Sequence, residues 1–248
     1  APSGTLERAT YGKLPEGEGV EIIEINRMRR AIADSTILSK QQVPHFYLTI
    51  SVDVEPLVAL RKQINAQLEG EGVKVSVNDM IVKASALALR KFPNLNSHYY
   101  GDKIVRFKAV NIGIAVALPN NGLVNVVARD ADKVALSELA KTNKAMFDRA
   151  RDGKIKPDDI KGATFTISNL GPYDIDQFSA IISPPEAGIL AIGAAKKLPI
   201  VKEDGTIGIG TRMNITLSVD HRVSDGAEGA QYLNEVKALL ENPMRLLV

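Results

Sequence analysis

The stretch that decides the fold is residues 213–226, MNITLSVDHRVSDG. Apolar and polar residues alternate up to Val219, which predicts a half-buried strand that stops just before His221. Asp225 followed by Gly226 then opens a predicted helix that runs to about residue 241. A neutral imidazole at the end of a strand is a natural general base near pH 7. Taken alone, the pattern also fits a histidine in a surface turn and an aspartate that only caps a helix.

The rest of the chain mixes strands and helices without the regular rhythm of a doubly wound sheet. Apolar residues spaced three or four apart predict helices, and alternation predicts strands and hairpins. The sequence therefore predicts an α+β fold, in which helices pack on a mixed, largely antiparallel sheet. The predicted helices cover residues 26–40, 57–68, a segment from 76 onward and 134–151; the predicted strands cover 45–54, 163–168, 178–183 and 187–194, and hairpins span 99–107 and 109–128.

The N-terminal segment differs from the rest of the chain. Residues 1–21 contain glycines and prolines but no sustained apolar period, so we expect a flexible N-terminal arm or the end of a linker there. Residues 22–248 show no shift in composition and no linker, which predicts one compact domain. The chain starts with Ala1 rather than Met, and we therefore expect a fragment of a longer polypeptide.

The composition excludes several kinds of chemistry. The chain has no cysteine, so it has no disulfides, no thiolate zinc site and no cysteine nucleophile. His45, His98 and His221 lie far apart in the sequence, and a metal site is not expected. A formal net charge of +2 is too balanced to favour nucleic acid as a partner. No apolar run reaches the ~18–20 residues of a membrane span, and we expect the protein in the bacterial cytoplasm or the mitochondrial matrix.

The segment His221–Gly226 matches the HxxxDG signature of dihydrolipoamide acyltransferases, the core subunits of 2-oxoacid dehydrogenase complexes. Chloramphenicol acetyltransferases carry the same signature. The chain resembles the acyltransferase family in further blocks, which follow the family's order and extend over residues 22–248. The resemblance implies a two-layer fold like that of chloramphenicol acetyltransferase. The further blocks are RRAIA (29–33), SVND (76–79), GIAV (113–116), TFTISNLG (164–171) and PPE (184–186).

The resemblance implies acyl transfer between a dihydrolipoyl group and coenzyme A, which bring both thiols. His221 matches the family's general base, which takes the proton from a thiol whose pKa is ~8.5. Ser168 matches the serine that donates to the tetrahedral oxyanion, although the sequence alone favours a turn residue that bonds to its own backbone. Asp225 matches a structural carboxylate that pairs with an arginine, and Arg29 and Arg30 are both candidates for that partner.

Other charged residues receive less specific assignments. We expect His45 and His98 to be surface or structural residues, because neither matches a catalytic position of the family. Lys196, Lys197 or the arginines of residues 27–30 could meet the phosphates of coenzyme A, but solvated charge is the favoured interpretation. No cofactor-binding residue and no metal ligand is assigned.

The acyl group expected from the resemblance is acetyl. The segment FSAII (178–182) and the following Pro184-Pro185 resemble the pyruvate dehydrogenase branch of the family. Four departures from that branch leave branched-chain or other acyl specificity open. They are Asn125, Asp174, Ser183 and Glu186.

The resemblance also implies partners. Family members form trimers that assemble into larger cages, so we expect a homo-oligomer in which His221 of one subunit and Ser168 of the next share each site. Lipoyl domains, upstream in the chain or separate, would carry the lipoyl group. The 2-oxoacid decarboxylase and dihydrolipoamide dehydrogenase subunits would complete the complex. A chloramphenicol-type O-acetyltransferase and a non-catalytic core scaffold remain the alternatives.

Overall fold

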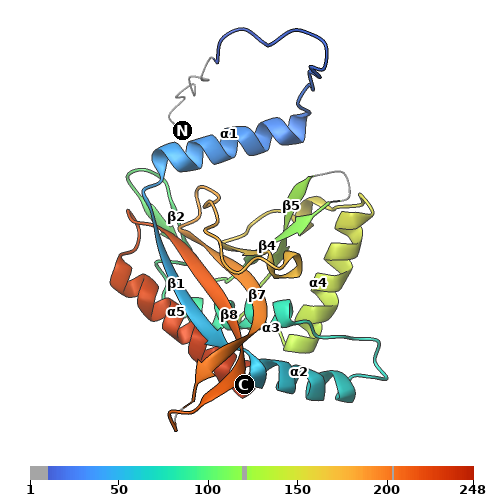
Figure 1. Ribbon diagram of the computed structural model, residues 1–248, viewed down its shortest axis with the longest axis vertical. Helices are drawn as coiled ribbons and strands as arrows, with labels where there is room; N and C mark the ends of the chain where they lie inside the picture. Colours follow the sequence, from blue (N-terminus) through green and yellow to red (C-terminus); the bar gives the residue numbers. More distant parts are fainter. Residues whose placement is uncertain (1–10, 119–121, 203) are drawn as a thin grey trace.

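The computed structural model describes residues 11–118, 122–202 and 204–248. A six-stranded sheet lies at its centre, with the strands in the order β1-β8-β7-β6-β4-β5 (Figure 1). β6 runs parallel to both β7 and β4, and the other neighbours pair antiparallel, which confirms the predicted mixed sheet. The strands are β1 (His45–Asp53), β4 (Ile112–Ala117), β5 (Leu123–Ala128), β6 (Phe165–Asn169), β7 (Gly188–Val201) and β8 (Ile207–Asp220).

Helices and a short hairpin accompany the sheet. Their positions agree with the predicted helices and with the hairpin predicted at 99–107. Within the described ranges, none of the helices is both long and apolar enough to cross a membrane. The elements are α1 (Arg27–Gln42), α2 (Glu55–Gln67), α3 (Val77–Leu89), α4 (Leu136–Arg151) and α5 (Gly226–Glu241), with β2 (Ser97–Tyr99) paired to β3 (Ile104–Arg106).

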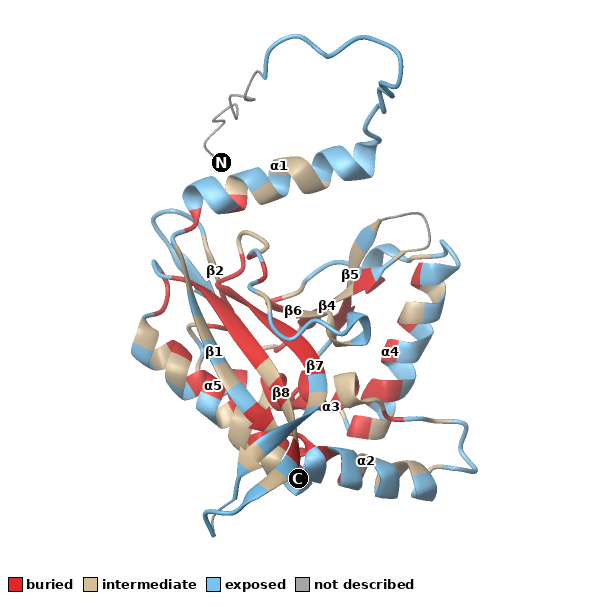
Figure 2. Cartoon of the chain, in the orientation of Figure 1, coloured by how far each residue is buried: buried red, intermediate tan, exposed pale blue. Residues whose placement is uncertain are grey.

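Helices α3 and α5 cover one face of the sheet, and the apolar residues between them form the core. Gly229 of α5 lies so close to β1 and β8 that a Cβ atom there would be 3.0 Å from Leu48 and 3.5 Å from Leu217. The hydroxyls of Tyr232 in α5 and Ser85 in α3 lie 2.6 Å apart, which satisfies both buried groups. Figure 2 shows this buried layer running along β7 and β8. Burial of its apolar side chains is the main stabilising contribution.

The segment 170–187 covers the opposite face of the sheet. Ser218 Oγ on β8 donates to the carbonyl oxygen of Ala180 at 2.7 Å, and Ser39 Oγ on α1 donates to that of Ile182 at 2.6 Å. The side chains of Ala180 and Ile182 join Ile189 of β7 in a second, smaller apolar cluster. The segment is therefore fixed to the sheet by side chains that reach its backbone.

The strand predicted at 178–183 is wrong. The alternation that suggested it is present, because Ala180 and Ile182 are buried while Ile181 is 40% exposed. The backbone groups of this segment, however, bond to Ser218, Ser39 and His45 side chains and not to a neighbouring strand. An extended segment on an apolar surface has the periodicity of a strand without its ladder.

Strands β7 and β8 are longer than predicted. The predicted strands end at 194 and start at 213, whereas the structure continues the pair to Val201 and from Ile207. Two features hid the extension: a register shift between Ile192 and Ala195, and Gly208 and Gly210, which interrupt the apolar alternation. Residue 203, in the connection between β7 and β8, lies outside the described residues, and so do residues 119–121 of the hairpin predicted at 109–128.

Helix α1 lies at the edge of the main body in Figure 1, and Ser39 near its C-terminal end attaches it to Ile182. Asn26 caps the helix by accepting a hydrogen bond from the Arg29 N–H at 2.8 Å. Residues 11–26 form neither helix nor strand and are exposed, and residues 1–10 of the predicted arm lie outside the described part of the chain. The predicted boundary between arm and domain at residue 22 stays a prediction.

Candidate active site

His221 follows β8 directly, as the sequence predicts, and is exposed. Its backbone N–H donates to the carbonyl oxygen of Pro44 at 3.0 Å. Its ring packs against Phe46, with the ring centroids 4.8 Å apart. Phe46 lies on the helix-covered face, where its ring faces Gly229 of α5. An exposed imidazole on a fixed backbone can exchange a proton with a bound substrate.

Asp225 is the N-cap of α5. Its Oδ1 accepts a hydrogen bond from the Glu228 N–H at 2.9 Å, and its backbone is extended, as an N-cap requires. Among the described residues of this single chain, no ion pair joins Asp225 to Arg29 or Arg30 of α1. The pairing of Asp225 with Arg29 or Arg30 that the resemblance implies therefore stays a prediction.

A different carboxylate and arginine hold the histidine turn. Arg222 donates to Asp220 through Nε at 2.9 Å and through a terminal nitrogen at 2.7 Å, and Asp220 is 1% exposed. The sequence reasoning missed this pair, although the residues flank His221. An acid at the last position of a buried strand, two residues before an arginine, is the signal that could have identified it.

Ser168 lies near the end of β6, on the face opposite the helices. It sits opposite Ala191 of β7, which in turn sits opposite Thr216 of β8. The turn after it is held by Asn169, whose side chain donates to Asn78 Oδ1 at 3.0 Å and accepts from the Gly171 N–H at 2.9 Å. Asn78 belongs to the first turn of α3, so this turn is joined to a buried helix.

The structure does not bring Ser168 and His221 together within one chain. The register places Thr216 level with Ser168 two strands away, and His221 follows five residues further along β8. With strands ~4.8 Å apart and ~3.3 Å per residue, the two Cα atoms are separated by roughly 20 Å. Five residues along a strand also reverse the face, and the His221 ring indeed lies on the helix side.

The other two histidines are structural, as predicted. His45 bonds through Nδ1 to the Val43 carbonyl at 2.8 Å and through Nε2 to the Ile182 N–H at 3.1 Å, which assigns the proton to Nδ1. His98 Nε2 lies 3.2 Å from the carbonyl oxygen of Ala163. Burial lowers the pKa of both imidazoles, so both remain neutral at pH 7.

Glu186 is a buried acid whose environment the sequence did not reveal. It lies opposite His98 in a bridge beside β2, and burial raises its pKa to about 7, against a smaller opposing effect of the Thr166 hydroxyl. Its Oε2 has no hydrogen-bond partner among the described residues. Thr166 precedes Ser168 by two residues on β6 and shares its face.

The candidate cations for coenzyme A differ in their surroundings. Lys196 Nζ lies 3.2 Å from Asp174 Oδ1 and also contacts Asp176 Oδ1, so two carboxylates already neutralise it. Lys197 is exposed. Asp174 has a φ of 60°, in the left-handed region that favours glycine.

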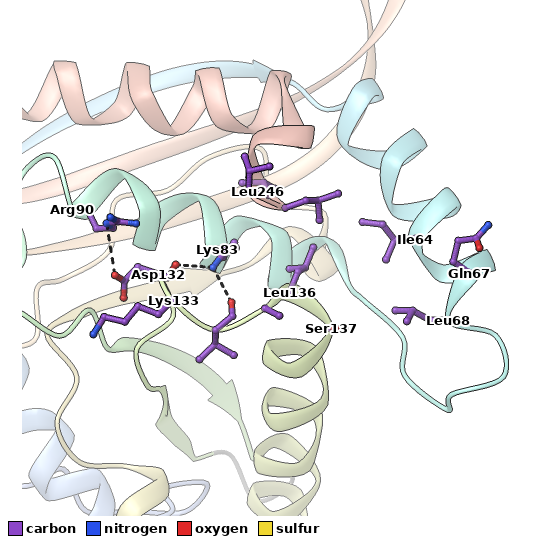
Figure 3. A pocket seen from close by; sticks show the side chains of 14 residues that line it. Ile64, Gln67, Leu68, Lys83, Arg90, Asp132, Lys133, Leu136, Ser137 and Leu246 are labelled. Carbon is purple, nitrogen blue, oxygen red and sulfur yellow. Dashed lines mark hydrogen bonds and ion pairs between the residues drawn. The ribbon is translucent and has the colours of Figure 1, made fainter.

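A hollow in another part of the molecule does not include His221 or Ser168. It has a volume of about 640 Å³ and is lined by α2, α3, the start of α4 and the C-terminus (Figure 3). Lys83 is one of the residues that line the hollow. Its Nζ donates to three carbonyl oxygens, those of Ala131, Asp132 and Val134. The hollow therefore presents no free lysine ammonium at that position. In the described ranges no cluster of histidines and acids could hold a metal ion.

The comparisons with known proteins identify the family of this chain. The family model of 2-oxoacid dehydrogenases acyltransferase (catalytic domain) matches residues 17–248, so the chain belongs to this family. A similar relative is the dihydrolipoyllysine-residue acetyltransferase component of the pyruvate dehydrogenase complex of Zymomonas mobilis, 41% identical over 246 residues that cover 99% of this chain and 55% of the relative. The mitochondrial component 3 of Arabidopsis thaliana is 43% identical over 245 residues, covering 97% and 45%. The chain thus spans about half the length of these relatives.

Solved structures show the same fold. The dihydrolipoamide acetyltransferase of Azotobacter vinelandii superposes with a TM-score of 0.88 at 30% identity, covering 96% of this chain and 100% of that one. A chloramphenicol acetyltransferase superposes with a TM-score of 0.54 at 14% identity, covering 89% and 99%. The second similarity is one of fold, and it confirms the chloramphenicol-acetyltransferase-like architecture.

Proposed function

We propose that this chain transfers an acyl group, acetyl in the first instance, between dihydrolipoamide and coenzyme A. In this proposal it is the catalytic domain, residues 22–248, of a core subunit of a pyruvate dehydrogenase complex. The observation that carries the proposal is the family match over residues 17–248, with a histidine at the end of β8 and a serine near the end of β6. The relatives named as acetyltransferase components of pyruvate dehydrogenase complexes are 41–43% identical over nearly the whole chain.

His221 acts as the general base in this reaction. A thiol of pKa ~8.5 is mostly protonated at pH 7, so a base in contact with it raises the fraction of thiolate. The imidazole takes the S–H proton of coenzyme A as its sulfur attacks the thioester carbonyl. It then returns the proton to the departing dihydrolipoamide sulfur, so one thiol and one thioester are consumed and one of each is formed.

Ser168 donates a hydrogen bond to the oxyanion that forms during this attack. Since Ser168 and His221 lie roughly 20 Å apart on opposite faces of the sheet by strand spacing, one chain cannot supply both to one substrate. We therefore place His221 of one subunit beside Ser168 of the next. A head-to-tail interface of this kind closes into a ring and repeats the pair once per subunit.

The Azotobacter vinelandii enzyme supports these assignments. Its crystallographic and enzymatic investigation concerned a serine, a histidine and an asparagine in the catalytic mechanism. There the serine precedes the histidine by nearly the interval that separates Ser168 from His221, and the asparagine follows it by four residues. Asp225 occupies that third position here, and we assign it to holding the start of α5 beneath the histidine turn.

The substrates and partners follow from the same proposal. Coenzyme A is a substrate, and the lipoyl group arrives on an upstream or separate lipoyl domain. The subunits form trimers that assemble into a cage, which binds the 2-oxoacid decarboxylase and dihydrolipoamide dehydrogenase subunits; a structure of the family is described as the cubic core of a pyruvate dehydrogenase complex. The compartment is the bacterial cytoplasm or the mitochondrial matrix, since relatives come from bacteria and mitochondria.

The deciding experiment measures acyl transfer from acetyl-coenzyme A to dihydrolipoamide. A branched-chain acyl-coenzyme A is tested as the alternative donor, and chloramphenicol is tested as the alternative acceptor. We expect turnover with acetyl-coenzyme A and dihydrolipoamide. Preference for the branched donor would reassign the acyl group within the family. Transfer to chloramphenicol alone would show an O-acetyltransferase, and no transfer by the assembled protein would leave a scaffold.

A further inference from the structure

Asp220 forms hydrogen bonds with the backbone of the residues that follow His221. Its carbonyl oxygen accepts from the N–H groups of Val223 at 2.9 Å and Ser224 at 3.2 Å, and its Oδ1 accepts from the Arg222 N–H at 3.0 Å. The N–H of Asp220 itself donates to Ala187 at 2.9 Å. Three of the N–H groups that follow His221 thus bond to one residue that is 1% exposed. The turn that carries the histidine is built on Asp220.

Arg222 completes this turn from the other side of His221. Its guanidinium makes a two-pronged contact with the Asp220 carboxylate and lies 4.0 Å from the centroid of the Tyr99 ring. Tyr99 is fixed in turn, because its N–H donates to the Pro185 carbonyl at 2.8 Å. Arginine suits this place better than lysine, since its planar group can pair and stack at once.

The imidazole depends on this turn for its position. Within the described residues its one aromatic neighbour is Phe46, and the side chain is otherwise exposed. Without the guanidinium, the Asp220 carboxylate would be buried and unpaired, which is costly enough to rearrange the turn around it. A shift of ~1 Å in a catalytic group can cost ~10²-fold in rate.

We infer that Asp220 and Arg222 are positioning residues, whose bidentate pair across His221 holds the imidazole in its catalytic place. The inference rests on the proposed function, because it needs His221 to be the base. Neither residue touches the reacting atoms in this proposal. Both act through His221, and their contribution disappears when the imidazole is removed.

The test is a double-mutant cycle on the assembled protein, with acetyl-coenzyme A and dihydrolipoamide as substrates. We expect Arg222→Ala to lower kcat by ~10- to 10²-fold while both KM values stay within about twofold. Arg222→Lys should recover part of this loss, because it restores the charge but not the planar fork. In the His221→Ala background, Arg222→Ala should leave the residual rate unchanged.

Arg149→Ala is the matched control. Arg149 makes a similar two-pronged pair with the buried Asp159, at 2.8 and 2.6 Å, at the end of α4. Arg149→Ala should lower the Tm, because it breaks the pair with Asp159, and should leave kcat unchanged. The comparison separates a general loss of stability from a displaced histidine.

Three results would overturn the inference. An equal loss in the presence and absence of His221 would show that Arg222 acts independently of the imidazole. A raised KM for coenzyme A with an unchanged kcat would make Arg222 a substrate-binding residue instead. A full rate in Arg222→Ala would deny it any role. Full activity in His221→Ala would contradict the proposed function itself, which the same cycle reports separately.

Discussion

Ser168 and His221 stand on opposite faces of the same sheet, two strands and five residues apart in its register. This relationship makes assembly a condition of catalysis under the proposed function. Mixed trimers of His221→Ala and Ser168→Ala subunits should therefore regain activity. Random mixing places an intact histidine beside an intact serine at about a quarter of the interfaces. The measurement is the specific activity after the two variants are unfolded together and reassembled.

That prediction has a direct contradiction. If both residues served a site within one subunit, each mixed trimer would stay as inactive as its parents. Mass spectrometry of the intact assembly shows whether mixed trimers have formed. No recovery in confirmed mixed trimers would reject the shared site and leave acyl transfer itself open.

The single variants should each be impaired in kcat. His221→Ala should lose ~10²–10⁴-fold, the range for a positioned general base. Ser168→Ala should lose ~10²–10³-fold, the range for one oxyanion donor. Both groups act mainly in the transition state, so steady-state kinetics should show KM values close to those of the unchanged protein. His45→Asn is not a suitable control, because His45 holds the segment at Ile182.

Asp225 should matter as a cap. Asp225→Ala should destabilise the protein by about 1 kcal/mol, because it removes the acceptor for the Glu228 N–H. Asp225→Asn should cost much less, since asparagine caps a helix almost as well as aspartate. Urea unfolding of both variants measures the difference. An Asp225→Asn protein with an unchanged Tm and no activity would instead point to a direct chemical role.

Glu186 predicts an unusual pH dependence of stability. Its folded pKa is raised from 4.5 to about 7, so between these values the folded state binds the proton more tightly than the unfolded state. Stability contributed by this group is therefore complete below pH ~4.5 and is lost as the pH rises to about 7. Relative to Glu186→Gln, the unchanged protein should lose about 3 kcal/mol of stability across that window.

The measurement compares the free energy of unfolding of the two proteins at several pH values. Glutamine has nearly the same shape and no charge, so it isolates the ionisation. Parallel curves for the two proteins would mean that Glu186 titrates normally in the folded state.

Gly193 should tolerate no side chain. A Cβ atom there would lie 2.2 Å from the carbonyl oxygen of Asp176 and 3.2 Å from that of Asn214. Gly193→Ala should therefore push the segment after Ser168 away from β7 and lower both Tm and kcat. Gly70→Ala is the control, because nothing lies within 4 Å of its Cβ position. Equal Tm values for the two variants would show that the segment moves freely.

The sequence predicted what local patterns encode. The alternation up to Val219, the helix from residue 76 onward and the helix that Asp225 opens all rest on spacing within a few residues, and the structure contains each of them. Those signals were sufficient for the sheet type and for the place of His221.

What the sequence could not predict depends on distant pairings. The segment 178–183 has the alternation of a strand, but its backbone bonds to side chains more than thirty residues away. The burial of Glu186 arises from β2 and β6, which lie far from it in the chain. The sequence could not choose between Arg29 and Arg30 as the partner of Asp225, and the pair that the folded turn forms is a different one, between Arg222 and Asp220.

The three-carbonyl cage around Lys83 has a consequence for chemical modification. Acyl thioesters slowly acylate free lysine amines, and under the proposed function this chain is exposed to such reagents. Burial lowers the pKa of Lys83, yet each N–H of its ammonium group is already bonded, so releasing a proton to free the lone pair would break one of these bonds. Acylating reagents should therefore label exposed amines such as Lys197 long before Lys83. The rate at which Lys83 is modified should be set by local opening of the fold.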